Sequence, residues 1–291
     1  MLLRIVSIIF PLFAIVLLGW LYGRRHRPDM ALANQLNMDV FVPALVFAAL
    51  AGKSFDLLSY PALALGAAAV VLGSGLAAWP LARLLGIAPK TFLPPMMFNN
   101  SGNMGLPLAV LAFGEAALPA AVMLFLVANL LHFSLGTWML DHRARLLQLW
   151  RMPMMLAALA GLALSLSGAA LWPPLLTAVR MLGDISIPLL LFTLGVRLAG
   201  ATFHAWGVGL AGAVARPLVG MAIALGASLA LGLNREHHAM LLVFGALPPA
   251  VLNYVFAERY QQEPEKVASI VMVGNVAALL FIPLALAVAL R

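Results

Sequence analysis

Residues 98–112 read FNNSGNMGLPLAVLA, a polar and glycine-containing stretch inside a long apolar segment. A helix that crosses a bilayer must satisfy its own backbone hydrogen bonds, because the hydrocarbon core contains no water. The glycines loosen the helix, and Pro107 removes one backbone donor and clashes with the preceding turn. The stretch therefore predicts a helix that breaks inside the membrane and exposes backbone groups and asparagine amides. Such breaks are typical of the binding sites of carriers.

The composition of the whole chain is that of an all-α polytopic membrane protein. Of its 291 residues, 64% are hydrophobic and 9% are charged, and the mean hydropathy is +1.04. A soluble domain carries about 25% charged residues. The net charge of +7 does not indicate a nucleic-acid partner, because the basic residues lie between the apolar segments rather than in one patch. The chain has no cysteine and hence no thiolate chemistry, and we predict neither a metal nor a cofactor.

Since one span takes about 20 residues, the chain has room for about ten. The predicted spans are, approximately, residues 2–22, 32–51, 60–85, 91–113, 118–140, 152–171, 175–196, 203–233, 238–257 and 267–290. The loops after the odd-numbered spans carry eleven basic residues, and the opposite side carries four. The eleven are Arg24, Arg25, Arg27, Arg83, Lys90, Arg143, Arg145, Arg151, Arg197, Arg259 and Lys266. The positive-inside rule makes these loops cytoplasmic, so we predict a cell inner membrane protein with both termini extracytoplasmic.

Two pairs of similar segments indicate an internal repeat. Residues 39–47 (DVFVPALVF) resemble residues 184–192 (DISIPLLLF), and residues 106–111 (LPLAVL) resemble residues 247–252 (LPPAVL). The offsets are 145 and 141 residues, whereas a rival alignment pairs 94–99 with 248–253 at an offset of 154. We prefer the first alignment because its two pairs agree.

Five spans per copy is an odd number, so the two halves must be inverted relative to each other. The predicted repeats are residues 1–145, with helices 1–5, and residues 146–291, with helices 6–10. Helices 4 and 9 are then the broken pair. We expect them to meet at a crossover in which Pro107 matches Pro248 and the adjacent Pro249.

Three motifs carry a family resemblance. Residues 100–108 (NSGNMGLPL) are similar to the N-x-x-x-(M/L)-G-x-P-L signature of the auxin efflux carrier family, which includes plant PIN proteins and bacterial malate and malonate permeases. Residues 246–260 are similar to its second proline motif, and residues 182–184 with 192–195 resemble its seventh-span pattern. The resemblance implies ten spans, inverted repeats, the crossover and a homodimer. The short loop between spans 5 and 6 indicates a short bacterial type of carrier and favours auxin itself less as the substrate.

The predicted substrate-binding residues are Asn100, Asn103 and Gly105 in the first broken span and Asn253 in the second. The alternative is that their amides satisfy carbonyls freed at the breaks or, for Asn253, make an interhelical hydrogen bond. The half-helix N-termini at a crossover carry a partial positive charge and unpaired N–H groups. We therefore expect an anion to be held there without an arginine beside it.

Four ionisable residues in apolar segments are candidates for charge compensation or coupling, since such residues are functional suspects by default. Asp39 and Asp184 occupy matching positions in the repeat and are either proton or cation sites or partners of nearby cations such as Arg180. For Arg216 we favour snorkelling toward the cytoplasmic surface over a role as counter-charge. For His132 we favour hydrogen bonding inside the bundle over proton relay.

The leading interpretation is a secondary transporter that moves a small organic anion by alternating access. Its substrate would be a mono- or dicarboxylate, malate-, malonate- or auxin-like. The alternative is a cation- or proton-coupled exchanger or symporter on the same scaffold, which would be expected to place carboxylates beside the breaks. We do not expect an enzyme, because the chain contains no GxSxG, HExxH or paired intramembrane aspartates. The expected partners are the organic anion and the lipid bilayer.

Overall fold

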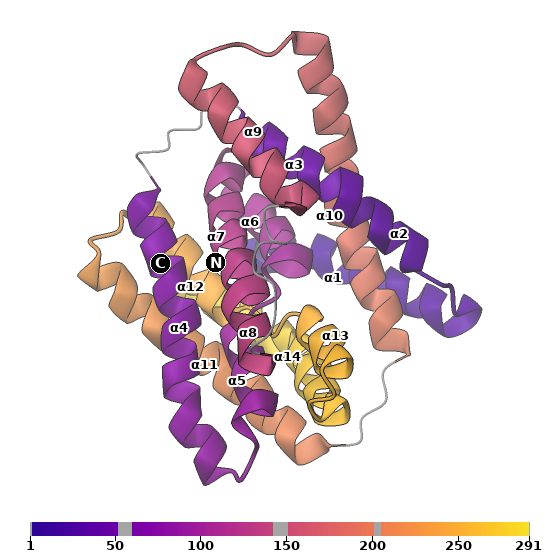
Figure 1. Ribbon diagram of the computed structural model, residues 1–291, viewed down its shortest axis with the longest axis vertical. Coiled ribbons are helices and arrows are strands. Elements are labelled where there is room, and N and C mark those ends of the chain that lie inside the picture. Colours follow the sequence, from indigo (N-terminus) through magenta and orange to yellow (C-terminus); the bar gives the residue numbers. More distant parts are fainter. Residues whose placement is uncertain (1, 52–59, 142–150, 201–204, 291) are drawn as a thin grey trace.

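The computed structural model describes residues 2–51, 60–141, 151–200 and 205–290, and these form a bundle of helices (Figure 1). Seven helical segments in the described ranges are long and apolar enough to cross a membrane. They are α1 (Leu2–His26), the continuous run from α2 (Ala31–Leu36) through α3 (Val42–Leu50), α4 (Pro61–Leu84), the run from Glu115 to Leu140 that contains α7 (Leu118–Leu131) and α8 (Thr137–Leu140), α10 (Pro173–Ala199), α11 (Trp206–Ala230) and α14 (Pro264–Ala289). The protein is therefore a helical, multi-pass membrane protein.

The other three predicted spans are the ones that are short or interrupted. Helix α9 (Pro153–Ser167) has 15 residues, which at 1.5 Å per residue is shorter than the hydrocarbon core. The predicted span 4 is split into α5 (Pro89–Met97) and α6 (Leu106–Phe113), and span 9 into α12 (Arg235–Ala246) and α13 (Leu252–Arg259).

Local sequence explains where several of these helices begin. Helices α4, α5, α9, α10 and α14 all have proline at the first helical position, where the missing N–H has no partner to lose. Helix α12 is capped instead by Asn234, whose side chain accepts a hydrogen bond from the backbone N–H of His237 at 2.8 Å.

The helices pack in two groups (Figure 1). In one group α10 packs against α1 and α3, and α3 packs against α9. In the other, α11 packs against α4, α12 and α14, and α4 also contacts α5 and α7. Small residues allow close approach inside each group: a Cβ added at Gly195 of α10 would lie 2.0 Å from the Val16 oxygen of α1. Such small-residue contacts are the common means of packing helices in lipid.

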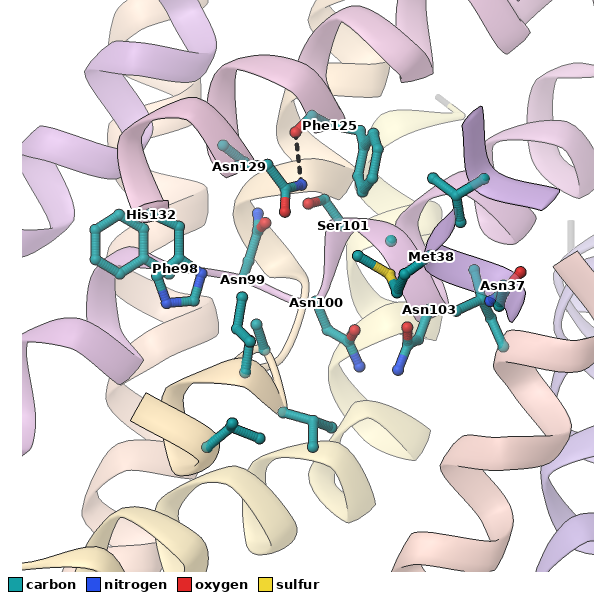
Figure 2. Close-up of a pocket in the computed structure, with 18 of the residues that line it drawn as sticks. Asn37, Met38, Phe98, Asn99, Asn100, Ser101, Asn103, Phe125, Asn129 and His132 are labelled. Carbon is teal, nitrogen blue, oxygen red and sulfur yellow. Dashed lines mark hydrogen bonds between the residues drawn. The ribbon is translucent and has the colours of Figure 1, made fainter. Parts of the chain in front are cut away.

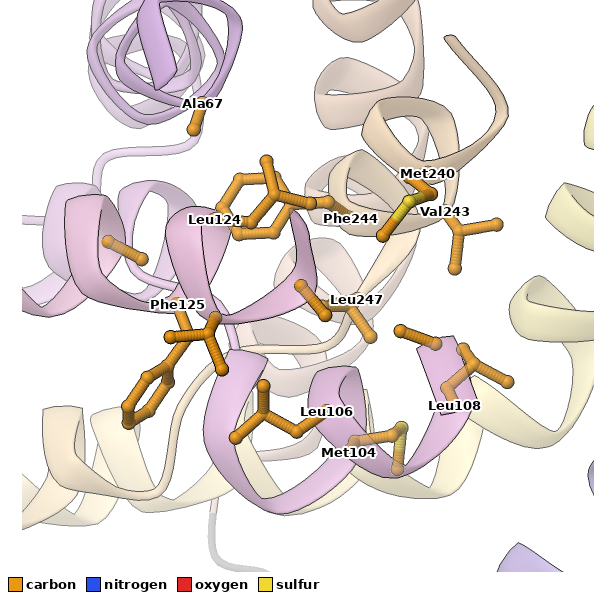
Figure 3. Packing of buried hydrophobic residues seen from close by; sticks show 14 of the residues in the cluster. Ala67, Met104, Leu106, Leu108, Leu124, Phe125, Met240, Val243, Phe244 and Leu247 are labelled. Atoms are coloured by element: carbon orange, nitrogen blue, oxygen red, sulfur yellow. The ribbon is translucent and has the colours of Figure 1, made fainter. Parts of the chain in front are cut away.

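The two split helices lie in the second group and are held by its apolar core. Figure 3 shows Met104, Leu106 and Leu108 of the first split helix beside Phe244 and Leu247 of the second. All five side chains are buried. The packing fixes the two interruptions relative to each other, which positions the site described next.

Candidate functional site

The two helix interruptions meet and pair through their backbones. We call residues 98–100 the first break and residues 247–251 the second break. The Asn100 N–H donates to the Pro248 oxygen at 2.7 Å, and the Ala250 N–H donates to the Phe98 oxygen at 2.9 Å. Asn99 and Pro249 form the antiparallel bridge between these two bonds. Backbone groups that would otherwise be unpaired inside the protein are thus satisfied by the opposite break.

The reciprocal bonds join the two breaks in antiparallel register. They pair residue 100 with residue 248 and residue 98 with residue 250, on either side of the bridge between Asn99 and Pro249. The alignment of the two repeats stays a prediction. Pro107 is the second residue of α6, in a continuous helical run, and is not part of the first break. Helix α6 directly follows the π-helical turn η3 (Ser101–Gly105), and such a local change of hydrogen bonding accommodates a proline without a break. Pro248 and Pro249, by contrast, lie in the second break as expected.

Asparagine side chains reinforce the pairing of the breaks. The Asn253 Nδ2 donates to the Phe98 and Ala250 oxygens, both at 2.9 Å. The Asn99 Nδ2 donates to the Phe244 oxygen at 2.8 Å, near the end of α12. Asn253 thus ties the two breaks together, and it does not line the cavity described below.

Asn275 on α14 links both breaks and was not among the predicted site residues. Its Oδ1 accepts a hydrogen bond from the Asn100 Nδ2 at 2.9 Å, and its Nδ2 donates to the Pro249 oxygen at 3.0 Å. Asn275 is 3% exposed. A lone asparagine in an otherwise apolar membrane helix is the signal that would have found it.

A cavity of about 310 Å³ lies between the two helix groups, directly beside the breaks (Figure 2). The second helix group contributes the first break, Ser101–Asn103, residues 250–252 and the face of α7 that carries Asn129. The first group contributes Asn34, Asn37 and, from the last turn of α10, Arg197. Of the described residues that line the cavity, Arg197 alone is charged. The sequence led us to expect no arginine beside the site, whereas Arg197 lines this cavity.

The starts of two half-helices face the cavity. Ser101, Gly102 and Asn103 open the helical run that continues into α6, and the first backbone bonds of this run are donated by Met104 and Gly105 to the Asn100 oxygen. Val251 and Leu252 open α13 and also line the cavity. The N–H groups that precede the first helical bond are therefore close to the cavity, and helix N-termini favour negative charge.

Three π-helical turns in the described chain lie at this cavity: η1 (Asn37–Phe41), η3 (Ser101–Gly105) and η5 (His132–Gly136). Such turns are often found at functional sites. His132 lines the cavity and is 3% exposed, with its ring stacked on Phe98 at a centroid distance of 4.2 Å (Figure 2). The His132 Nε2 and the Oδ1 atoms of Asn37 and Asn99 are buried without a hydrogen-bond partner.

The remaining predicted site residues lie elsewhere. Gly105 is a packing position, since a Cβ there would lie 2.9 Å from Leu247 Cδ1, and it does not line the cavity. Asp39 is exposed in η1. Asp184 is also exposed and lines a separate cavity of about 580 Å³ together with Arg180 and Glu115. Among the described residues, Asp184 and Arg180 do not form an ion pair; the ion pair found there joins Lys266 and Glu263.

Arg216 does not snorkel. Its side chain is 0% exposed, and its Nη1 donates to the Gly245 oxygen at 3.0 Å. Gly220 and Gly245 make this possible, because the backbones of α11 and α12 approach so closely that a Cβ at Gly220 would lie 2.1 Å from the Gly245 oxygen. A guanidinium at the C-terminal end of α12 is favourably placed in the field of that half-helix. The predicted snorkelling is wrong because the contact of Gly220 with Gly245 joins two different helices, which the position of Arg216 along one segment does not reveal.

Comparison with protein families now assigns the chain. Residues 137–286, just over half of the chain, match the family model described as a membrane transport protein, which is the model of the auxin efflux carriers. The chain belongs to this family. It is thus a transporter of the auxin efflux carrier family, and the family is one of transporters rather than enzymes. No curated protein matches the chain. The match includes the second break, α14 and Arg216, but not the first break.

Proposed function

We propose that this auxin efflux carrier family member is a secondary carrier for a small organic anion that binds in the cavity beside the paired breaks. One observation carries the proposal. The half-helix starts at Ser101–Asn103 and Val251–Leu252 face the same cavity as Arg197, its one charged lining residue in the described chain. Backbone N–H groups with a guanidinium suit a carboxylate.

The proposed transport unit has ten spans in two inverted repeats, with helices 4 and 9 crossing at the paired breaks. The seven long helices, the short α9 and the two split helices account for this count. The basic residues favour extracytoplasmic termini in the inner membrane, which places Arg197 and Asn34 at the cytoplasmic end of the cavity. The predicted cytoplasmic loop at residues 142–150 lies outside the described residues. The homodimer remains a proposal from the family resemblance.

Coupling to protons or another cation is the second candidate, through Asp39, Asp184 or His132. Asp184 shares its separate cavity with Glu115, and no carboxylate lines the cavity beside the breaks among the described residues. The placement of the carboxylates therefore supports the proposed anion carrier, without coupling to a cation, more than a cation exchanger.

Uptake into proteoliposomes tests the proposal. The purified chain is reconstituted and supplied with labelled malonate, malate, lactate and acetate, with and without imposed proton and sodium gradients. We expect uptake of at least one acid, and we expect Arg197→Gln to weaken its apparent affinity by at least 10-fold, a loss of about 1.4 kcal/mol. Arg180→Gln, in the separate cavity, is the matched control. Unchanged affinity in Arg197→Gln would refute the anion site. If none of the acids is taken up even with an imposed sodium gradient, the cation exchanger would be favoured.

A further inference from the structure

The asparagines on one side of the first break have already used their amide nitrogens. The Asn99 Nδ2 donates to the Phe244 oxygen and the Asn129 Nδ2 donates to the Phe125 oxygen, each at 2.8 Å. A carbonyl oxygen accepts only from the nitrogen end of a carboxamide, so these bonds fix the orientation of both side chains. Figure 2 shows the Asn99 and Asn129 carboxamides turned toward each other beside Ser101. What each of them still offers is an oxygen, a hydrogen-bond acceptor.

Burial makes these acceptors informative. Asn99 is 4% exposed and its Oδ1 has no partner, and across the cavity Asn37 is 2% exposed with its Oδ1 also unpaired. Asn129 is partly exposed on the cavity wall, with its Oδ1 end free of any described hydrogen bond. Buried polar atoms in native proteins are nearly always paired, so an unpaired one calls for an explanation such as a bound group. The group that matches an amide oxygen is a donor.

A carboxylate cannot be that group, because an ionised carboxylate has only acceptors. Its place in the same cavity is at the donors, namely the backbone N–H groups of Ser101–Asn103 and the guanidinium of Arg197. One solute meets both requirements if it carries a carboxylate and, beside it, a hydrogen-bond donor. A hydroxyl fits better than an ammonium, since the described lining contains a cation, Arg197, and no carboxylate to pair with a second positive charge.

We propose that the cavity selects hydroxycarboxylates over the corresponding acids without a hydroxyl, and that Asn129 Oδ1 is the acceptor for the hydroxyl. The proposal rests on the proposed function, because it requires the cavity to bind organic anions. A site built to hydrogen-bond a hydroxyl rejects the analogue that lacks it, because its polar groups are then left unpaired.

Two matched pairs of acids test the proposal: L-lactate with propionate, and L-malate with succinate. Their binding to the purified full-length chain is measured by isothermal titration calorimetry. We expect at least one hydroxy acid to bind, and its hydroxyl-free partner to bind on the order of 5- to 10-fold more weakly, as for one lost hydrogen bond. Equal affinities within a pair that binds would overturn the selection while leaving the anion carrier standing. Binding of none of the four acids, or binding of sodium ions alone, would overturn both.

A variant locates the acceptor. Asn129→Leu should bring the affinity ratio of the pair close to one by weakening the hydroxy acid. Ser134→Ala is the matched control, because Ser134 on the same helical run also donates to a carbonyl one turn earlier, that of Leu130, but does not line the cavity. It should keep the wild-type ratio. If Asn129→Leu keeps the wild-type affinity ratio, the assignment of the acceptor to Asn129 is overturned. The affinity ratio of the wild-type chain tests the selection itself without relying on the folding of any variant.

Discussion

Replacing Asn275 with leucine removes the side chain that ties both breaks to α14. The substitution keeps the approximate volume and eliminates the bonds to Asn100 Nδ2 and the Pro249 oxygen. The third bond, to the Val271 oxygen, lies within α14, where that carbonyl keeps its helical backbone partner. Two groups in the paired breaks are thus left without a partner, and the Asn100 side chain is buried, with 3% of its surface exposed.

The size of the effect follows from the number of lost bonds. Hydrogen bonds between membrane helices contribute about 0.6 kcal/mol on average and up to about 1.7. Two lost bonds therefore predict that Asn275→Leu lowers the free energy of unfolding by about 1–3 kcal/mol. The neighbouring Val276→Leu, on the exposed face of α14, should stay within about 0.5 kcal/mol of the wild type.

Denaturant unfolding in detergent, followed for the wild type, Asn100→Ala, Asn275→Leu and the double variant, measures the effect as a double-mutant cycle. The two single variants share one bond, so the double variant should be less destabilised than their sum by about 0.6–1.7 kcal/mol. Strict additivity, or an Asn275→Leu variant as stable as the Val276→Leu control, would show that the breaks do not depend on this link.

Three further predictions concern other contacts. Arg216→Ala should lower the free energy of unfolding by about 2–4 kcal/mol, since it strips the Gly245 oxygen of its donor and leaves a cavity; thermal unfolding equal to that of the wild type would contradict the buried position. Gly220→Ala should lower the melting temperature because its Cβ collides with the Gly245 oxygen, whereas Gly226→Ala on the same helix, where nothing lies within 4 Å, should leave it unchanged or raise it; equal melting temperatures would refute the close packing. The Lys266 ammonium and then the Thr91 hydroxyl lower the pKa of Glu263 below 4.5, so this carboxylate stabilises the folded protein above that pH and the contribution disappears as the pH falls through the lower folded-state pKa. Glu263→Gln should accordingly melt earlier than the wild type at pH 7, and the difference in melting temperature should shrink as the pH falls below 4.5. A difference that grows in acid would contradict the lowered pKa.

Composition, apolar segments and the two proline motifs were enough to predict an α-helical membrane transporter with interruptions in two segments. The exact position of the first break was not predictable from Pro107. Pro107 is accommodated inside a helical run by the adjacent π-helical turn η3, whereas the chain leaves the helix at Phe98, where the opposite break supplies backbone partners. The partner of Phe98 is Ala250, 152 residues away, and periodicity along one segment contains no information about it.

The candidate site likewise contains residues that local sequence predicted and residues that only contacts between distant segments explain. Asn100 and Asn103 were predicted to line it from their place in a polar stretch, and they do. Arg197 was interpreted as a cytoplasmic loop residue because it ends an apolar run, yet the packing of α10 against the other helix group brings it to the cavity. The burial of Arg216 depends likewise on the contact of Gly220 with Gly245, two glycines on different helices. Pairings between distant elements, rather than local preference, decide these placements.

The central claim is that carboxylates bind in the cavity beside the paired breaks, and cysteine protection tests it most directly. The chain has no cysteine, so Leu252→Cys, at the start of α13 on the cavity wall, gives a single reactive thiol. We predict that a negatively charged thiosulfonate labels it and that saturating malate, malonate or lactate slows the labelling several-fold, whereas Glu115→Cys in the separate cavity is labelled at the same rate with and without acid. Labelling of Leu252→Cys at an unchanged rate in the presence of an acid that the reconstituted protein transports would contradict the account.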